Sequence, residues 1–378
     1  MDFTEPQDRA MFRDTLRRWF ADNYPITRRQ AAAEAPGGLD AAAWEELAGL
    51  GAVGVMFDEA AGGFSGDPFD IAVLFEELGR GGSVEPFLAT LVAGRLVADA
   101  GHGGGLAQLG AAIEGRAVLS PALFEPAGRY DAADVQTTAS REGGGWRLEG
   151  TKAVVPHGGA AGAFVVSARS AGGRWDEDGL SLFLVPADAP GVAVHGHPGI
   201  DGHAAAQVVL TGVSLGEEAL IGPEGAAWPL IEAACAAACL ALSAEALGLM
   251  EVCRDATVEY LRTRHQFGRP IGSFQALQHR MATLAVEIEQ ARSAVINAAG
   301  RLGAARRARE MAAAEAKALA GRIGRLVAEE AIQMHGGIGM TWEYPMTHFA
   351  KRLVMIDHWF GDVDHHTARF AELSRQAG

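Results

Sequence analysis

Two aspartates and two histidines occur within WFGDVDHH, residues 359–366 of the sequence. Carboxylates and imidazoles at this spacing suggest a metal site, a catalytic base or the start of a helix. Adjacent helical residues point about 100° apart, so His365 and His366 do not easily converge on one ion. Asp362 and Asp364 suit the acidic first turn of a helix. The spacing therefore argues against a metal site, and Asp362 stays a candidate base.

Two further segments carry groups suited to a phosphorylated ligand. In YLRTRHQFGRPIGSFQALQHR, residues 260–280, we expect a helix that ends at Gly268, with Arg264 beside the break. An arginine near unpaired backbone N–H groups can bind a pyrophosphate. In QMHGGIGMTWEYPM, residues 333–346, three glycines would let a flat or phosphorylated ligand approach the backbone. Each segment alone is weak, because a capped helix–loop–helix explains the first and the second lacks the dinucleotide-binding spacing.

The elements that must position these residues fall into three sections. Residues 1–120 show apolar residues at helical spacing between glycine-rich turns. Residues 121–222 read as short strands, and DVQTTASREGGGWRLEGTKAVV predicts a hairpin in which Trp146 and Leu148 alternate with polar residues. Helical spacing returns from residue 223. There we expect helices over residues 228–263, 274–300, 304–335 and 345–377.

Composition limits the class of partner. The 378-residue chain has a formal charge of −15, which argues against nucleic acid or an anionic membrane surface as the partner. The N-terminus lacks the apolar region of a signal peptide, and the apolar run at residues 233–244 is too short to span a bilayer. We therefore expect a cytoplasmic protein. The three cysteines, Cys235, Cys239 and Cys253, are expected to be reduced core thiols.

In combination, the motifs resemble the acyl-CoA dehydrogenase family. The residues that carry the resemblance are Arg264-x-Gln-Phe-Gly-x-Pro-Ile, Phe274-Gln275, Gln333-x-x-Gly-Gly-x-Gly and Glu343-Tyr-Pro, with GGFSGDPFDIAVLFEELGR and GGGWRLEGTK in support. The resemblance covers essentially the whole chain. It implies an α+β fold with an N-terminal helical domain (1–120), a middle β-barrel or sandwich domain (121–222) and a C-terminal four-helix bundle (223–378).

The resemblance also implies a chemistry. Such enzymes use FAD to desaturate an acyl-CoA thioester between Cα and Cβ, with a carboxylate as the base, and pass electrons to an electron-transfer flavoprotein. Family members hold the ADP part of a neighbouring subunit's FAD with residues from these motifs. The corresponding positions here are Arg264, Gln266, Phe267, Gln275, Gln333, Gly336 and Gly337. Oligomerisation would then be part of the chemistry.

The sequence departs from the family pattern where the reaction takes place. The usual catalytic glutamate position, counted from Glu343, holds Phe360, and an alternative position used by some members holds Ala238. Beside the flavin ring, where the family has an aromatic residue and a hydroxyl, the chain has Val154 and Pro156. Proline has no N–H to donate to a flavin. This subunit's own flavin-ring site is therefore in question.

These departures resemble the small subunit of heteromeric acyl-CoA dehydrogenases, of the pimeloyl-CoA or steroid side-chain type, which pairs with a larger homologous subunit in a heterotetramer. Two alternatives of the same fold stay open: a homo-oligomeric dehydrogenase with Asp362 as base, and a non-catalytic subunit that completes a partner's FAD site. The base could also come from a partner chain. Glu245 is interpreted as an interface or solvent-facing carboxylate, or else as a buried base. The acyl group is not identified.

Overall fold

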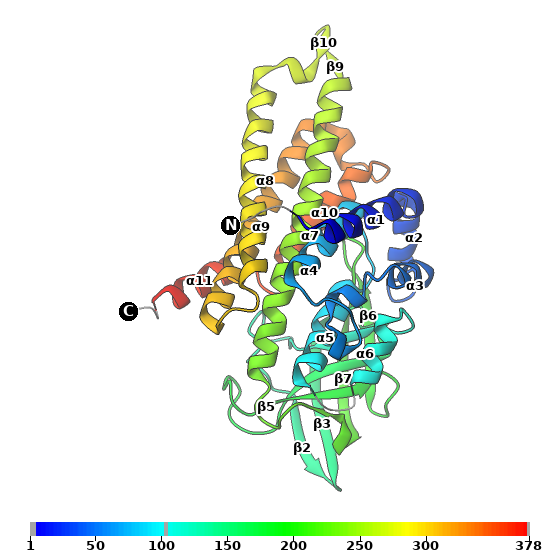
Figure 1. The fold of residues 1–378 in the computed structure, drawn as a ribbon, viewed down its shortest axis with the longest axis vertical. Coiled ribbons are helices and arrows are strands. Elements are labelled where there is room, and N and C mark those ends of the chain that lie inside the picture. The colour runs from blue at the N-terminus through cyan, green and yellow to red at the C-terminus, as the bar shows by residue number, and fades with distance from the viewer. Residues whose placement is uncertain (1–4, 102–104, 376–378) are drawn as a thin grey trace. The chain divides into compact units, whose positions relative to one another are not determined.

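The computed structural model describes residues 5–101 and 105–375, which form two compact units (Figure 1). The helical unit comprises the chain up to residue 29, residues 68–83 and the chain from residue 239. The β unit comprises residues 30–67 and 84–238. Helices at both ends of the chain and a sheet in the middle confirm the α+β fold class. The domain limits at residues 120 and 222 stay a prediction.

The helical unit is built around three long helices. Its elements are α1 (Gln7–Asn23), α4 (Pro68–Gly81), most of α7 (Trp228–Thr263), β9 (His265–Gln266), β10 (Arg269–Pro270), α8 (Gln275–Arg301), α9 (Arg306–His335), the 3-10 helix η5 (Gly336–Met340), α10 (Pro345–Asp357) and α11 (Val363–Arg375). The alanine-rich α9 packs against α8, α10 and α11. Figure 1 shows α8 and α9 side by side, with β9 and β10 beyond the ends of α7 and α8.

The C-terminal helices differ from the expected ones at two breaks. The helix expected over 345–377 is divided at residues 358–362, because Phe360 (φ 56°) and Gly361 (φ 113°) leave the helical region of backbone space. The helix expected over residues 228–263 has these bounds, whereas the other expected end, at Gly268, is wrong. A two-stranded hairpin follows it, with positive φ at Phe267 and Gly268. A phenylalanine in left-handed conformation is not foreseeable from residue type.

The β unit contains one eight-stranded mixed sheet. Short helices precede the first strand along the chain. Its strands are β1 (Leu119–Ala122), β2 (Thr138–Glu142), β3 (Gly145–Pro156), β4 (Ala163–Arg169), β5 (Leu180–Pro186), β6 (Val192–Pro198), β7 (Ala204–Gly216) and β8 (Leu220–Ile221). The order is β6-β7-β3-β2-β4-β5-β8, with β1 paired to β4. The helices are α3 (Ala41–Gly49), α5 (Phe87–Ala100) and α6 (Leu106–Ile113), while α2 (Ile26–Glu34) crosses between the units.

The expected hairpin is confirmed in β2 and β3. Gly143 and Gly144 form the turn with positive φ at both positions, as the twist of a two-residue hairpin requires. Trp146 and Leu148 point into the core of the sheet, where they are buried with Phe164 and Phe183 from β4 and β5. Alternation of apolar and polar residues was therefore a correct guide to the inner face.

Helix α7 has the length and apolar composition of a membrane-spanning helix. However, 89% of its most apolar window is buried inside the protein, as in the core helix of a globular protein. The three cysteines are free thiols, as expected. Burial raises the pKa of Cys239 and of Cys253 to about 12, so both thiols stay protonated and inert. Cys235 is only partly buried.

Candidate cofactor and substrate site

The hairpin after α7 presents its side chains to solvent. Gln266 pairs with Arg269 and His265 with Pro270, and the Ile271 N–H donates to the Arg264 carbonyl oxygen at 2.8 Å. These bonds fix the backbone while the Arg264 and Gln266 side chains stay exposed. Phe267 at the tip is 89% exposed. A large apolar side chain held in the open at a rigid tip suits contact with another molecule.

The glycine-rich turn after α9 lies at the same end of the helical unit. The ring of Tyr260, near the end of α7, stacks on the ring of His335 with 4.6 Å between centroids. Arg280 near the start of α8 forms an ion pair with Glu330 near the end of α9, at 3.1 Å. The structure thus brings together the end of α7, the start of α8 and the end of α9. All residues with a predicted cofactor role lie at or next to these three ends. Asp362, the predicted base, lies in a separate segment.

We call this set the clamp end: it consists of Arg264, Gln266, Phe267, Gln275, Gln333, Gly336 and Gly337, and all of them are exposed. A Cβ added at Gly336 or Gly337 would meet no atom within 4 Å, so a ligand can approach the backbone there. The neighbouring Arg262 and Arg269 add positive charge in a chain of net charge −15. Exposed guanidinium groups beside an open glycine turn fit the diphosphate and adenosine part of a dinucleotide.

The segment WFGDVDHH, residues 359–366, covers most of the turn between α10 and α11 and the first residues of α11. The Asp362 carboxylate accepts a hydrogen bond from the His365 N–H (Oδ1 to N, 2.9 Å) and thereby caps α11. The Val363 N–H donates to Asp357 Oδ1 at 3.1 Å. Among the described residues, no group of three or more histidine, cysteine, aspartate or glutamate side chains is arranged to hold a metal ion. Asp357 and Asp362 therefore both accept hydrogen bonds from backbone N–H groups at the start of α11.

The turn and the clamp end are separated within one chain. Helix α10 begins next to η5 and ends at the turn, and its 13 residues, at a rise of 1.5 Å each, span about 20 Å. The structure therefore does not bring Asp362 to the predicted cofactor-binding residues. One subunit would offer these two sets of residues to different parts of a large ligand, or to different ligands.

Beneath the turn lie buried polar side chains that sequence analysis missed. Lys317 of α9 donates to the carbonyl oxygens of Gly361 (2.6 Å) and Asp357 (3.2 Å). His366 Nε2 lies 3.0 Å from the Phe360 carbonyl oxygen and 3.8 Å from Cys239 Sγ. Burial lowers the pKa of Lys317 to about 8 and, together with the nearby Lys317 ammonium, that of His366 to about 3. His366 is therefore neutral and donates from Nε2 to the turn.

The β3 segment that would face a flavin ring in the family lacks the expected donors. Pro156 has no N–H, and the His157 N–H donates to the Ala204 carbonyl oxygen at 2.9 Å. Val154 is 52% exposed and has φ of 51°, an unusual conformation for a β-branched residue. A β-bulge lies between Lys152 and Val155. The residues at 156 and 157 therefore do not fit a flavin that needs backbone or hydroxyl donors at these positions.

A second buried hydrogen-bond network anchors the β3 segment through Lys152. Lys152 Nζ lies 2.8 Å from Glu125 Oε1 and donates also to Ser167 Oγ and the Leu123 carbonyl oxygen. The Thr137 N–H donates to Glu125 Oε1 at 2.9 Å. Burial opposes ionisation of Glu125, but its attraction to Lys152 and these hydrogen bonds lower its pKa overall. The signal that could have revealed this pair is the rarity of lysine, since the sequence has three.

Glu245 is neither solvent-facing nor available as a simple base. It is buried, and Arg352 of α10 donates to both of its oxygens, with Nε to Oε1 at 2.6 Å and Nη2 to Oε2 at 2.8 Å. The interpretation as an interface or solvent-facing carboxylate is therefore wrong. The pair joins α7 to α10 inside the helical unit.

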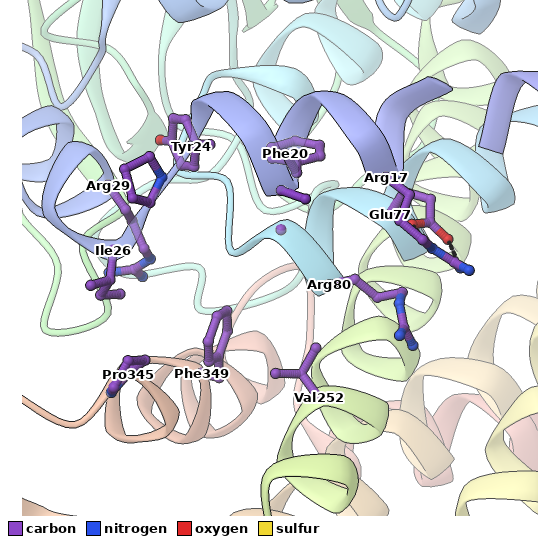
Figure 2. A pocket seen from close by; sticks show the side chains of 13 residues that line it. Arg17, Phe20, Tyr24, Ile26, Arg29, Glu77, Arg80, Val252, Pro345 and Phe349 are labelled. Carbon is purple, nitrogen blue, oxygen red and sulfur yellow. Dashed lines mark hydrogen bonds and ion pairs between the residues drawn. The ribbon is translucent and has the colours of Figure 1, made fainter. Parts of the chain in front are cut away.

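The helical unit also contains a pocket of about 440 Å³ that no sequence pattern indicated (Figure 2). Figure 2 shows Phe20, Tyr24 and Phe349 on its walls and the Arg17–Glu77 ion pair at its edge. It is lined by α1, α2, α4, α7 and α10. Neither Asp362 nor any residue of the clamp end lines it.

The fold and the comparisons with known families define the class of protein. Models of the N-terminal, middle and C-terminal domains of acyl-CoA dehydrogenases match residues 6–103, 120–213 and 227–372. The chain belongs to the acyl-CoA dehydrogenase family of oxidoreductases, which act on CH–CH groups, and its cofactor is FAD.

Several known proteins resemble it along most of its length. A probable acyl-CoA dehydrogenase of Bacillus subtilis (strain 168), YngJ, is 30% identical over 80% of this chain and 81% of its own. The solved Tcur3481-Tcur3483 steroid ACAD, in a variant form, is 32% identical with a TM-score of 0.87 over 98% of both chains. A solved structure of the electron transferring flavoprotein of Acidaminococcus fermentans includes a chain that is 28% identical, with a TM-score of 0.87 over 98% of this chain and 99% of that one.

Proposed function

We propose that this chain is the small subunit of a heteromeric acyl-CoA dehydrogenase and that its clamp end holds the ADP part of the FAD bound by a neighbouring subunit. The observation that carries the proposal is the exposure of the clamp end: fixed backbone, exposed Arg264 and Gln266, and open space over Gly336 and Gly337.

The β3 segment supports the heteromeric form of the proposal. A subunit that lacks donors at Pro156 and His157 is poorly suited to hold its own flavin ring. The steroid ACAD that resembles this chain carries a two-component name, which supports a partner chain, and we extend this to a larger homologous partner in a heterotetramer. We extend the proposal to a steroid-type acyl-CoA as the substrate and an electron-transfer flavoprotein as the acceptor, the latter supported by the likeness to the Acidaminococcus structure.

The residues of this chain would bind and orient rather than react. Arg264 would neutralise phosphate charge, Gln266 and Gln333 would donate to or accept from the nucleotide, and Phe267 would pack on it. FAD, when bound, supplies the acceptor for the hydride that leaves Cβ. In the assembly, the clamp end therefore fixes the cofactor and excludes water from its nucleotide part.

Replacement of the arginine tests this role. Arg264→Ala in the co-expressed complex should lower FAD affinity by about tenfold or more, because a charge-assisted bond to phosphate is lost. Arg325→Ala is the matched control, since Arg325 is an exposed arginine of α9 that lies about two helical turns before Gln333 and forms an ion pair with Glu329. Retained flavin is measured by absorbance after gel filtration. Equal FAD retention in both variants would remove the clamp from the proposal.

The identity of the base is a separate proposal. Asp362 is the only carboxylate in the turn 358–362, the segment that the resemblance places at the acyl-CoA site. If Asp362 removes the α-proton, Asp362→Asn should slow flavin reduction by orders of magnitude while FAD stays bound. Asp364→Asn, two residues along the same helix start, is the control. A wild-type reduction rate in Asp362→Asn would favour a base from the partner subunit.

A further inference from the structure

Lys317 is an unusual choice of residue for its position. The sequence has three lysines among 32 lysine and arginine residues, so arginine is the ordinary cation of this chain. Lys317 is fully buried in the middle of α9. Its ammonium donates to two backbone carbonyl oxygens, those of Gly361 and Asp357. Burial of a cation carries a large desolvation penalty, and its retention here argues for a specific role.

The carbonyl groups that Lys317 holds lie at both ends of one turn. Asp357 ends α10, and Gly361 directly precedes the start of α11. Between them Phe360 has a left-handed backbone (φ 56°), a conformation that a bulky side chain adopts only under constraint. The third constraint is His366, which binds the Phe360 carbonyl oxygen at 3.0 Å. Three carbonyls of the turn are thus held from inside the helical unit.

Charged and titratable groups of α7, α10, the turn and α11 interact with Lys317. They are Cys239 of α7, Arg352 of α10, Asp357 and Asp362 at the ends of the turn, and His366 of α11 through its own interaction with Lys317. Asp357 and Asp362 favour the protonated lysine, whereas burial and Arg352 oppose it, and the Cys239 thiol, which stays protonated, contributes no charge. The ammonium therefore lies between the turn and the core, close enough to influence the Asp362 carboxylate.

We propose that Lys317 is a positioning residue that fixes the turn 358–362 and, through it, the Asp362 carboxylate at the start of α11. This inference rests on the proposed function only in placing the turn at the acyl-CoA site. The conformational part stands on the hydrogen bonds alone. Loss of the Lys317 side chain would leave the buried Gly361 carbonyl oxygen and the partly buried Asp357 carbonyl oxygen without this donor, and would release the strained Phe360 backbone.

Hydrogen exchange tests the conformational part without any assay of activity. In the assembled protein, Lys317→Met should speed exchange of the backbone amides of residues 357–366 by about tenfold or more, with the rest of α9 unchanged. Lys317→Gln keeps a donor but no charge, so it should give an intermediate result and serves if the methionine variant folds poorly. Lys351→Met, on neighbouring α10, is the control. Unchanged exchange in both Lys317 variants, or an equal effect of Lys351→Met, would overturn the proposal.

A double-mutant cycle tests whether Lys317 acts through Asp362. In the active assembly, Lys317→Met should lower kcat by about tenfold to a hundredfold with KM and FAD content unchanged, because a small displacement of a reacting group costs rate rather than binding. In an Asp362→Asn background the same change should have no further effect. A further, additive loss would show that Lys317 acts elsewhere. If Asp362→Asn alone has full activity, the proposed base fails, while the exchange result still decides the positioning role.

Discussion

Glu245 and Arg352 form a bidentate ion pair inside the helical unit, with Nε to Oε1 at 2.6 Å and Nη2 to Oε2 at 2.8 Å. Both side chains are almost fully buried. The pair links the middle of α7 to α10, the helix that carries the turn before α11. Its geometry satisfies both oxygens of the carboxylate, which is the condition under which a buried pair avoids a large desolvation penalty.

Removal of one partner of this pair should strongly destabilise the fold. Glu245→Ala leaves a buried guanidinium without its carboxylate and should lower the free energy of unfolding by about 3–5 kcal/mol. Glu329→Ala removes the exposed partner of Arg325 and should have no measurable effect. Urea denaturation of the two variants measures the difference. Similar midpoints for both would show that the Glu245–Arg352 pair does not stabilise the fold.

Acid should destabilise the protein through His366. The folded state holds the pKa of His366 at about 3, chiefly by burial, below the ordinary value of 6.5. Between these values the unfolded chain binds the extra proton, so the contribution of His366 to stability is present above pH 6.5 and is lost as pH falls toward 3. His366→Gln, which keeps a donor for the Phe360 carbonyl oxygen, should flatten the dependence of unfolding free energy on pH in this window. An unaltered slope would contradict a buried neutral imidazole.

Alkali should have the opposite effect through Lys317. Burial lowers the pKa of this ammonium to about 8, below the 10.5 of an ordinary lysine. Because the unfolded chain binds the proton more tightly, the contribution of Lys317 to stability rises as pH increases from about 8 to 10.5. With three lysines in the sequence, selective labelling of the lysine side-chain carbons resolves the titration by NMR. A Lys317 signal, assigned by its loss in Lys317→Met, that titrates near 10.5 would contradict its burial.

Much of the fold follows from apolar spacing alone. Alternation placed Trp146 and Leu148 on the inner face of β3, and the glycine pair at 143–144 predicted the hairpin turn. The positions of α7, α8 and α9 followed from their period. The sequence did not predict the helix break at residues 358–362, which depends on tertiary contacts. Phe360 adopts a left-handed conformation because Lys317 and His366 hold the turn. No local preference of phenylalanine indicates this conformation.

The candidate site was predictable only in part, for a similar reason. The residues of the clamp end could be singled out from short sequence motifs, because they lie close together along the chain in two segments. The buried pairs, Glu245 with Arg352 and Glu125 with Lys152, join residues that are far apart in sequence and share no local pattern. Their partners become known only when helices and strands are placed beside one another.

Val154 offers a test of strain in the β3 segment. Its φ of 51° costs a β-branched residue of the order of 1–3 kcal/mol, and the side chain is 52% exposed, so it contributes little to the core. Val154→Gly should therefore raise the free energy of unfolding by about 1 kcal/mol. Val194→Gly in β6, where φ is ordinary for a strand, should lower it. Thermal unfolding of both variants measures the effect, and destabilisation by Val154→Gly would refute the strain.

The flavin content of the purified protein tests the central claim most directly. The visible absorption spectrum should be recorded for this chain alone and for the chain co-expressed with a larger homologous subunit. We predict that the lone chain retains little FAD, since Pro156 and His157 lack the donors for the ring, and that the complex is yellow and reduced by an acyl-CoA. A lone chain with one FAD per subunit that turns over acyl-CoA would contradict the account.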